Sequence, residues 1–511
     1  MNRIHQLLDN KPDHALIAVD FDRTRVSYGE MRKLAAELAG ILAKHGVRAG
    51  DRLMLLAENS AFYAAALFAA SRLDAWIVLV NARQSAAEIA AIAVHSGART
   101  ILFTMNTSEN ARAHAARLNA VRIGDLPVGP VVVTPLAETL VEPVQESRDQ
   151  VAVLLYTTGT TSAPKGVMLS HGNLIFNAEN SANFNGLCAN DHVLAVLPGT
   201  HVYCLASVFL PAVAAGGSVR FVPRFDAGAV LGMLRHGITR FAGVPQMFAA
   251  IIALLQATGE TLDAPGLRNL ATGGAPLDPD LKSRTEAVFG LPLNNGYGLT
   301  ETSPTVAATH NRAPRSDLSV GHAMPGVEVG IDHADRDGIG EIRVRGPNIM
   351  QGYYRDPVLT AQAISPDGWF RTGDLGRIDP DGAIHVVGRL KELIIRSGFN
   401  VYPPEVEAML TRHQAVHQAA VVGRSHGGDE EILAFLLTDG TVSEAELQTW
   451  LRQRLVAYKL PQHLFLVDSF PTAATGKILK HRLVAHFDEL IRARDRSAPN
   501  FTRPVGHSEQ S

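Results

Sequence analysis

The sequence predicts an α/β protein: a large N-terminal domain of layered α/β subdomains plus a β-rich subdomain, then a small, mobile α+β C-terminal domain. In the first hundred residues, apolar positions at helical spacing alternate with short apolar runs of strand length. A second stretch of this kind runs from Val151 to about Leu293. From Gly321 to Gly388, short segments are separated by Asp-Gly and Gly-Pro pairs, which are typical of turns.

The first long helix is expected after Ser27. Ser27 and Glu30 form a capping box, residues 31–42 carry an apolar stripe, and Gly46 supplies a stop. Such alternation of helices and strands favours parallel sheets covered by helices. The expected strands include residues 52–57, 76–80, 151–156 and 218–222.

The domain boundary is expected after Gly388, where a mixed α+β pattern begins that is long enough to fold around its own core. We therefore predict a large domain over residues 1–388 and a small domain over residues 389–492. The polar tail over residues 493–511 contains two prolines and is expected to be mobile.

Composition excludes several classes of protein. The chain has 511 residues, is 46% hydrophobic and 19% charged, and has a formal net charge of −3, which argues against disorder and against a nucleic-acid partner. The two cysteines, Cys188 and Cys204, form no CxxC pair and fit a reducing compartment. No apolar run is long enough for a membrane span or signal core, so we expect no transmembrane segment and a cytoplasmic location. The oligomeric state stays open, with a homodimer as one alternative.

A polar loop follows the strand expected at residues 151–156. Residues 156–166 read YTTGTTSAPKG, which concentrates four threonine hydroxyls, a glycine and a lysine. Hydroxyls and backbone N–H groups donate to phosphate oxygens, and Lys165 adds charge. Pro164 stands where a Walker A loop requires glycine, so this is a phosphate loop of another kind or a polar surface turn.

Two glycine-rich segments follow. Residues 295–301 read NGYGLTE, in which Tyr297 can present its ring to a planar base while Thr300 and Glu301 face phosphate or metal. Residues 273–276 read GGAP, a segment poor in side chains that suits close approach to an adenine. Alone, NGYGLTE is a weak signal, and GGAP is more typical of a simple turn.

Two charged motifs come later in the chain. The string WFRTGDLG places Asp374 on an expected tight turn, where its carboxylate could accept two ribose hydroxyls, and Arg389 could meet the same ribose. Taken singly, Asp374 and Arg389 are more typical of a structural ion pair than of ligands, because such pairs are common. The string PTAATGKIL places Lys477 on a loop, where a single lysine would ordinarily be solvent-exposed.

These motifs, in this order and over nearly the whole chain, resemble the adenylate-forming (AMP-binding) superfamily, which includes acyl-CoA synthetases, luciferases and adenylation domains of peptide synthetases. The pattern is most similar to 4-coumarate:CoA ligases and to medium- or long-chain acyl-CoA synthetases. The resemblance implies an ATP-dependent carboxylic acid:CoA ligase that forms an acyl-adenylate and pyrophosphate, and then acyl-CoA and AMP. It implies ATP and Mg²⁺, with coenzyme A as a co-substrate.

The resemblance also assigns roles to residues. The loop over 157–165 would hold the β- and γ-phosphates, and Glu301 would bind Mg²⁺. Lys477 would bridge the carboxylate and the α-phosphate, because a carboxylate repels the triphosphate that it must attack. The residues expected to be catalytic are Lys477, His201, Thr300 and Glu301. The residues expected to bind the nucleotide are Thr157, Thr158, Gly159, Thr160, Thr161, Lys165, Gly274, Ala275, Asn295, Gly296, Tyr297, Thr300, Asp374 and Arg389.

The second half-reaction is expected to need a domain rotation. In the superfamily the small domain turns about a hinge that matches Lys391. The strand expected to contain Ser397 and Gly398 would then guide the pantetheine arm of coenzyme A. Lys391→Pro is expected to block thioester formation but not adenylation.

The acyl pocket is expected to combine His201, Tyr203, Ser207 and Val244. His201 matches the histidine that borders the substrate carboxylate, although Thr200 departs from the aromatic residue usual before it. The segment FAGVPQMF, residues 241–248, and the region 303–306 should form the rest of the pocket. FAGVPQMF contains no Arg or Lys, which disfavours dicarboxylates such as malonate.

The substrate is therefore expected to be an aryl, phenylpropenoic, or medium- to long-chain fatty acid. Tyr203 with Ser207 leans slightly toward an aromatic acid with a polar ring substituent. Three alternatives stay open: a luciferase-type monooxygenase, a ligase that loads a carrier protein, and a catalytically inactive binding paralogue. The inactive paralogue is disfavoured because the charged residues of the motifs are all present together: Lys165, Glu301, Asp374, Arg389 and Lys477.

Overall fold

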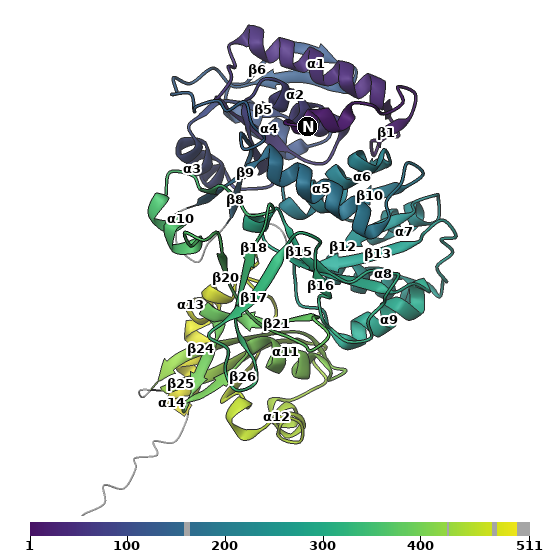
Figure 1. Cartoon of the computed structure of the whole chain (residues 1–511). Coiled ribbons are helices and arrows are strands. Elements are labelled where there is room, and N and C mark those ends of the chain that lie inside the picture. Colours follow the sequence, from purple (N-terminus) through teal and green to yellow (C-terminus); the bar gives the residue numbers. More distant parts are fainter. Residues whose placement is uncertain (158–163, 427–428, 473–477, 498–511) are drawn as a thin grey trace, which may run out of the picture. The chain divides into compact units, whose positions relative to one another are not determined.

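The computed structural model describes residues 1–157, 164–426, 429–472 and 478–497 (Figure 1). The chain divides into two compact units, Met1–Val386 and Val387–Ser511. The boundary falls inside strand β21 (Ile384–Arg389). No described helix is long and apolar enough to cross a membrane.

Unit 1 contains a nine-stranded sheet with the order β16-β15-β14-β13-β12-β10-β11-β1-β2. Its strands from β14 to β1 run parallel, and antiparallel strands extend both edges. The strands are β1 (Leu16–Val19), β2 (Arg25–Ser27), β10 (His192–Ala195), β11 (Ser218–Phe221), β12 (Arg240–Gly243), β13 (Asn269–Gly273), β14 (Leu293–Gly298), β15 (Thr305–Ala308) and β16 (His322–Ala323).

A second, eight-stranded sheet of unit 1 has the order β19-β9-β8-β4-β3-β5-β7-β6. The two βα stretches expected from the sequence exchange strands, because β1 and β2 join the nine-stranded sheet while β8 and β9 join this one. Its strands are β3 (Arg52–Ala57), β4 (Trp76–Asn81), β5 (Ala98–Phe103), β6 (Val121–Leu126), β7 (Gly129–Val133), β8 (Val151–Thr157), β9 (Lys165–Ser170) and β19 (Gly352–Tyr353).

The β-rich subdomain expected between Gly321 and Gly388 contains a four-stranded sheet with the order β17-β18-β20-β21. The turn predicted at Gly338 is confirmed, because this residue adopts a positive φ of 75° between the first two of these strands. The strands before β21 are β17 (Glu328–Asp332), β18 (Gly340–Arg345) and β20 (Phe370–Ile378).

The helices of unit 1 begin and end where local chemistry allows. The expected capping box is confirmed: Ser27 Oγ accepts from Glu30 N, and Gly46 ends the helix at a positive φ of 107°. The next helix is buried on every side from Ala61 to Ser71, as its small apolar residues require. The helices are α1 (Tyr28–His45), α2 (Ala61–Arg72), α3 (Ala86–Ser96), α4 (Glu109–Arg117), α5 (His171–Asn185), α6 (Leu210–Ala215), α7 (Ala227–Leu234), α8 (Pro245–Thr258), α9 (Pro279–Phe289) and α10 (Pro357–Ala363), with short helical turns η1 (Ile4–Leu8), η2 (Tyr203–Phe209) and η3 (Thr300–Thr302).

Unit 2 is an α+β unit with the hairpin β22-β23 and the sheet β24-β25-β26. The first part of the predicted mobile tail, residues 493–497, is helical, because α14 continues to Ser497. Residues 498–511 lie outside the described part of the chain. Ion pairs hold the last turn of α14: Arg494 pairs with Glu444, and Asp495 with Arg424. The elements after β21 are η4 (Leu390–Glu392), β22 (Ile394–Arg396), β23 (Phe399–Val401), α11 (Pro403–Thr411), β24 (Val416–His426), β25 (Asp429–Thr438), α12 (Glu444–Arg452), η5 (Ala457–Lys459), β26 (His463–Leu466), α13 (Lys480–His486) and α14 (Asp488–Ser497).

Candidate active site

The carboxyl ends of the parallel strands β12, β13 and β14 form one edge of the nine-stranded sheet, where ligands bind in open α/β sheets. A Cβ on Gly273 would lie 2.9 Å from the carbonyl oxygen of Gly296, so this edge admits no side chain there. Gly274 has a positive φ of 77°, and a Cβ on it would lie 4.0 Å from both Tyr203 and Val244. The structure thus brings the predicted adenine segment and two predicted acyl-pocket residues together; Ala275 follows in the same segment.

Tyr297 and Asp374 also meet, although they lie on different sheets. The Tyr297 hydroxyl donates to Asp374 Oδ2 at 2.8 Å, and Asp374 is only 5% exposed. The tight turn predicted for Asp374 is wrong, because Asp374 lies within β20. There, Gly373 adopts a positive φ of 71° and the pairing with β18 shifts register. This irregularity directs the carboxylate toward Tyr297 without ending the strand.

Asn295 is engaged in holding strands together. Its backbone N–H donates to Thr309 Oγ1 at 2.8 Å, and its side-chain amide nitrogen lies 3.2 Å from the Leu318 carbonyl oxygen. These bonds fix β14 and therefore the position of Gly296 and Tyr297. Any contact of Asn295 with adenine remains a prediction.

A second cluster forms around Glu301, which lies in η3 with Thr300. The Tyr353 hydroxyl donates to Glu301 Oε1 at 2.9 Å, and Lys165 Nζ lies 5.7 Å from the centre of the Tyr353 ring. Burial raises the pKa of Glu301, while the Tyr353 hydrogen bond and the charge of Lys165 oppose that rise. The sequence analysis missed Tyr353, because only the pairing of β19 with β9 brings it here.

Three predicted acyl-pocket residues, His201, Tyr203 and Ser207, lie on or just before η2, which is a π-helical turn, and Val244 immediately precedes α8. Single π-helical turns are frequent at functional sites. His201 is exposed, and its Nδ1 accepts from Tyr203 N at 3.2 Å. Farther along, the hydroxyls of Ser207 and Thr305 lie 3.0 Å apart. Asn177 supports this pair by accepting from the backbone N–H of Thr305 at 3.3 Å.

The predicted contribution of segment 241–248 to the acyl pocket is largely wrong. Phe241 and Phe248 are 1% and 0% exposed and pack together in the hydrophobic core, with ring centres 5.0 Å apart. Ala242, Val244 and Met247 are the partly buried residues of this segment that pack against the core cluster containing η2. Phe241 on β12 and Phe248 on α8 therefore both face the core, and the partly buried residues between them remain candidates for the pocket wall.

The predicted site residues of unit 2 lie at the end of one strand, in a short helical turn and in a hairpin turn. Arg389 ends β21, and Lys391 is exposed in η4. Ser397 and Gly398 lie in the turn between β22 and β23, with φ values of 48° and 81°, so the predicted strand is wrong there. Ser397 is fixed by Asp429, which accepts from both its N–H and its hydroxyl at 2.8 and 2.7 Å.

Five predicted residues lie outside the described part of the chain: Thr158, Gly159, Thr160, Thr161 and Lys477. Thr157 ends β8 and Lys165 begins β9, and these two residues pair across the two strands. The two ends of the predicted phosphate loop are therefore held side by side by the sheet.

Comparison with known proteins decides the family. The sequence model of the AMP-binding enzyme family matches residues 5–354, and that of the AMP-binding enzyme C-terminal domain matches residues 405–477. The chain belongs to the AMP-binding enzyme family. This confirms the resemblance expected from the motifs.

Relatives in this family support a more specific activity. A feruloyl-CoA synthase of Amycolatopsis sp is 36% identical over 483 residues, covering 92% of this chain and 96% of the relative. A 4-coumarate–CoA ligase of Oryza sativa subsp. japonica is 33% identical over 508 residues, covering 94% of this chain and 93% of the relative. The protein is an AMP-forming acid–CoA ligase.

Solved structures in the same family confirm the fold class. ATP-bound MatB from Rhodopseudomonas palustris superposes with a TM-score of 0.84 at 28% identity, covering 96% of this chain and 100% of that one. o-Succinylbenzoate CoA synthetase from Bacillus subtilis, in complex with its acyl-adenylate intermediate, superposes with a TM-score of 0.81 at 29% identity, covering 94% and 97%. The chain is therefore an ATP-binding, adenylate-forming enzyme.

Proposed function

We propose that this ligase activates a ring-hydroxylated phenylpropenoic acid and transfers the acyl group to coenzyme A. The hydroxyl pair of Ser207 and Thr305 carries this proposal. Tyr203, one helical turn before Ser207, lies against Gly273 and Gly274, so the pair belongs to the wall of the predicted acyl pocket. A hydroxyl can donate and accept at once, so the pair can bind one phenolic hydroxyl of a substrate.

The neighbouring side chains favour a flat, apolar acyl group. Tyr203 and Val244 flank the glycine segment and offer apolar surface to an aromatic ring. A fatty acid would offer the hydroxyls of Ser207 and Thr305 no partner beyond each other, which leaves part of their hydrogen-bonding capacity unmet in a buried pocket. The names of the two relatives, a feruloyl-CoA synthase and a 4-coumarate–CoA ligase, agree with this choice.

In the first half-reaction, we assign nucleotide binding to both clusters of unit 1. Asp374, held by Tyr297, would accept the ribose hydroxyls, with Arg389 as a second contact, while Gly274 and Tyr297 border the adenine. Lys165 and Thr300 would neutralise and orient phosphate oxygens. Lys477 would contact both the substrate carboxylate and the α-phosphate and reduce the repulsion between them. The carboxylate oxygen would then attack the α-phosphorus, and pyrophosphate would leave.

Glu301 fits a magnesium ligand. It offers a carboxylate, the ligand type that Mg²⁺ prefers, and Tyr353 takes up one of its oxygens at 2.9 Å. The hydrogen bond from Tyr353 would orient the carboxylate, as residues that hydrogen-bond to metal ligands commonly do. When bound, Mg²⁺ would supply positive charge to the phosphate oxygens of ATP.

In the second half-reaction, the thiol of coenzyme A would attack the acyl carbonyl carbon of the adenylate and displace AMP. His201 would border the carbonyl, Lys391 would act as the hinge, and the turn at Ser397 and Gly398 would contact the pantetheine arm. A Cβ on Gly398 would meet nothing within 4 Å, so the turn leaves open space for such a contact.

The test compares 4-coumaric, ferulic, cinnamic and octanoic acids. AMP release would be measured with ATP and Mg²⁺, with and without coenzyme A, and the thioester identified by mass. We expect CoA-dependent turnover, with kcat/KM for 4-coumaric acid about tenfold above that for cinnamic acid, since one hydrogen bond is lost. A preference for octanoic acid would refute the substrate class, and adenylate without thioester would favour a carrier-protein acceptor.

Thr305→Val sharpens this test. Valine keeps the shape of threonine but removes its hydroxyl, so the ratio of kcat/KM between 4-coumaric and cinnamic acids should fall toward one. Thr309→Val serves as the control, because the Thr309 hydroxyl contacts the backbone of Asn295 instead. An unchanged ratio in Thr305→Val would exclude the hydroxyl pair as the phenol site.

A further inference from the structure

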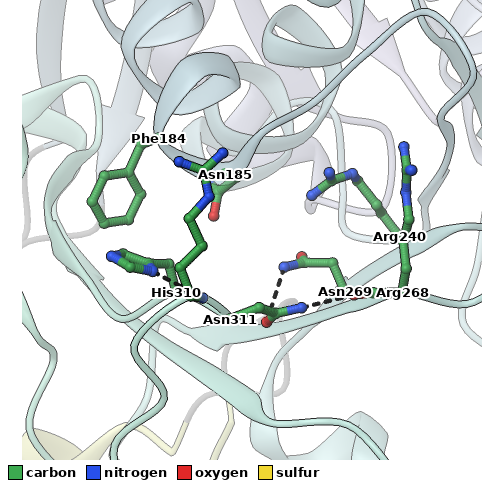
Figure 2. A pocket seen from close by; sticks show the side chains of 8 residues that line it. Phe184, Asn185, Arg240, Arg268, Asn269, His310 and Asn311 are labelled. Carbon is green, nitrogen blue, oxygen red and sulfur yellow. Dashed lines mark hydrogen bonds between the residues drawn. The ribbon is translucent and has the colours of Figure 1, made fainter.

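A cavity of about 110 Å³ lies at the opposite edge of the nine-stranded sheet from the candidate active site. β12 begins there with Arg240 and β13 begins with Asn269, whereas the candidate site lies where these strands end. Figure 2 shows Arg240 and Arg268 on one side, with Phe184 and His310 on the other. The cavity is lined by Phe184, Asn185, Arg240, Arg268, Asn269, His310, Asn311 and Arg312.

Arg240 is unusual among the residues that line the cavity, because it is 93% buried and part of its guanidinium group lacks a hydrogen-bond acceptor. Its Nη2 donates to the Gly186 carbonyl oxygen at 2.8 Å, and its Nε lies 2.9 Å from Asp191 Oδ2. Its Nη1 is buried and has no hydrogen-bond partner among the described residues. A buried guanidinium N–H without an acceptor is costly, so an acceptor in the cavity would stabilise the fold.

The cavity also has an excess of positive charge. Asp191 is the carboxylate that pairs with Arg240, and it is shared with Arg268, whose Nη2 lies 2.6 Å from Asp191 Oδ1. Arg312 forms no ion pair within the part of the chain that the structure describes. Arg240 and Arg268 thus share one carboxylate and Arg312 adds a third guanidinium, so the cavity wall carries three positive charges and one negative charge.

The carboxylate of Asp191 stays ionised, so it keeps its negative charge beside Arg240 and Arg268. Burial alone would raise the pKa of Asp191, but hydrogen bonds from Thr239 and Arg268 outweigh it and hold the pKa below its ordinary value. The remaining positive charge is therefore available to an external anion. The walls that hold it are rigid, because Asn311 bonds both the Arg268 carbonyl at 2.7 Å and Asn294 at 2.6 Å.

We propose that this cavity binds a phosphate-class dianion, either free inorganic phosphate or the terminal phosphate of a small phosphate monoester. The charge of a dianion equals the uncompensated charge of the cavity. Tetrahedral phosphate oxygens suit guanidinium forks, which donate two parallel hydrogen bonds. A cavity of about 110 Å³ has room for several water molecules, and hence for one such ion, but not for a nucleotide.

The experiment measures binding of phosphate to the full-length protein by calorimetry and by the shift in Tm. Inorganic phosphate, glycerol 3-phosphate and sodium chloride would be titrated at matched ionic strength. Arg312→Gln is the test variant, because Arg312 is exposed and its replacement spares the buried Arg240–Asp191 pair. Arg117→Gln, an exposed arginine at the end of α4, is the matched control.

We expect saturable phosphate binding and a rise in Tm in the wild-type protein and in Arg117→Gln. Arg312→Gln should bind about tenfold more weakly, since a charge-assisted bond is lost, while its KM for ATP and its Tm without phosphate stay unchanged. Binding of glycerol 3-phosphate would identify a monoester as the ligand class, and its failure would identify free phosphate. Equal phosphate binding in wild type and Arg312→Gln, as a catalytic phosphate site alone would give, would overturn the proposal, as would a Tm shift no larger than that from chloride.

Discussion

Removing one hydroxyl should reveal whether Asp374 binds the ribose of ATP. In Tyr297→Phe the ring that we propose borders the adenine stays, but the hydrogen bond to Asp374 Oδ2, 2.8 Å long in the wild type, is lost. A hydrogen bond to a charged group contributes about 1.5–3 kcal/mol. Asp374 keeps another interaction, so we take the lower end of this range.

A loss of about 1.4 kcal/mol corresponds to a factor of about ten. The KM for ATP of Tyr297→Phe should therefore rise about tenfold, while kcat stays within about twofold, because the bond positions the nucleotide and does not act on the reacting atoms. Initial rates of AMP release over a range of ATP concentrations would measure both constants.

Tyr354→Phe provides a matched control. The Tyr354 hydroxyl donates to Glu142 Oε1 at 2.5 Å, so the same chemical group is removed from another tyrosine–carboxylate pair. This variant should lose stability without a change in the KM for ATP. If Tyr297→Phe also leaves that KM unchanged, the assignment of Asp374 to the ribose is refuted.

Three further predictions concern the hinge, the response of stability to pH, and the last residue of β14. Lys391→Pro should abolish thioester formation but preserve ATP–pyrophosphate exchange, and equal loss of both would exclude the hinge. Burial lowers the pKa of His171 to about 3, so below pH 6.5 the unfolded chain binds a proton at this residue that the folded chain does not bind. The free energy of unfolding therefore has its full value above pH 6.5 and falls by up to about 1.4 kcal/mol per pH unit below it. Urea unfolding between pH 7 and 5 should show this slope in the wild type and a smaller one in His171→Gln. Gly298→Ala would place a Cβ 1.9 Å from the Pro304 carbonyl oxygen and should cost more than about 2 kcal/mol in urea unfolding, whereas Gly40→Ala on α1, with nothing within 4 Å, should be neutral or stabilising.

Local features were predictable from the sequence because neighbours in the chain determine them. Ser27, Glu30 and Gly46 specify the start and end of α1 through hydrogen bonds within a few residues. The order of the motifs was sufficient to indicate the family, since each motif is a short contiguous string. The fold class followed from the same periodicities.

Features that depend on distant pairing were not predictable in this way. Tyr353 reaches Glu301 only because β19 pairs with β9, and no local pattern marks that pairing. Asp374 was expected on a turn because Thr-Gly-Asp is turn-like, but the sheet accommodates Gly373 as an irregularity inside β20. Phe241 was expected in the pocket, whereas packing against Phe248 draws it into the core.

The position of β1 in the nine-stranded sheet has a consequence for synthesis. β1 pairs with β11, where Ala18 lies opposite Val219, about 200 residues later in the chain. A ribosome that adds about 5–20 residues per second needs roughly 10–40 s to make this partner. During that interval the N-terminal segment has left the exit tunnel without its parallel neighbour. Its solubility as a nascent chain therefore depends on its own composition and on chaperones until β11 has been made.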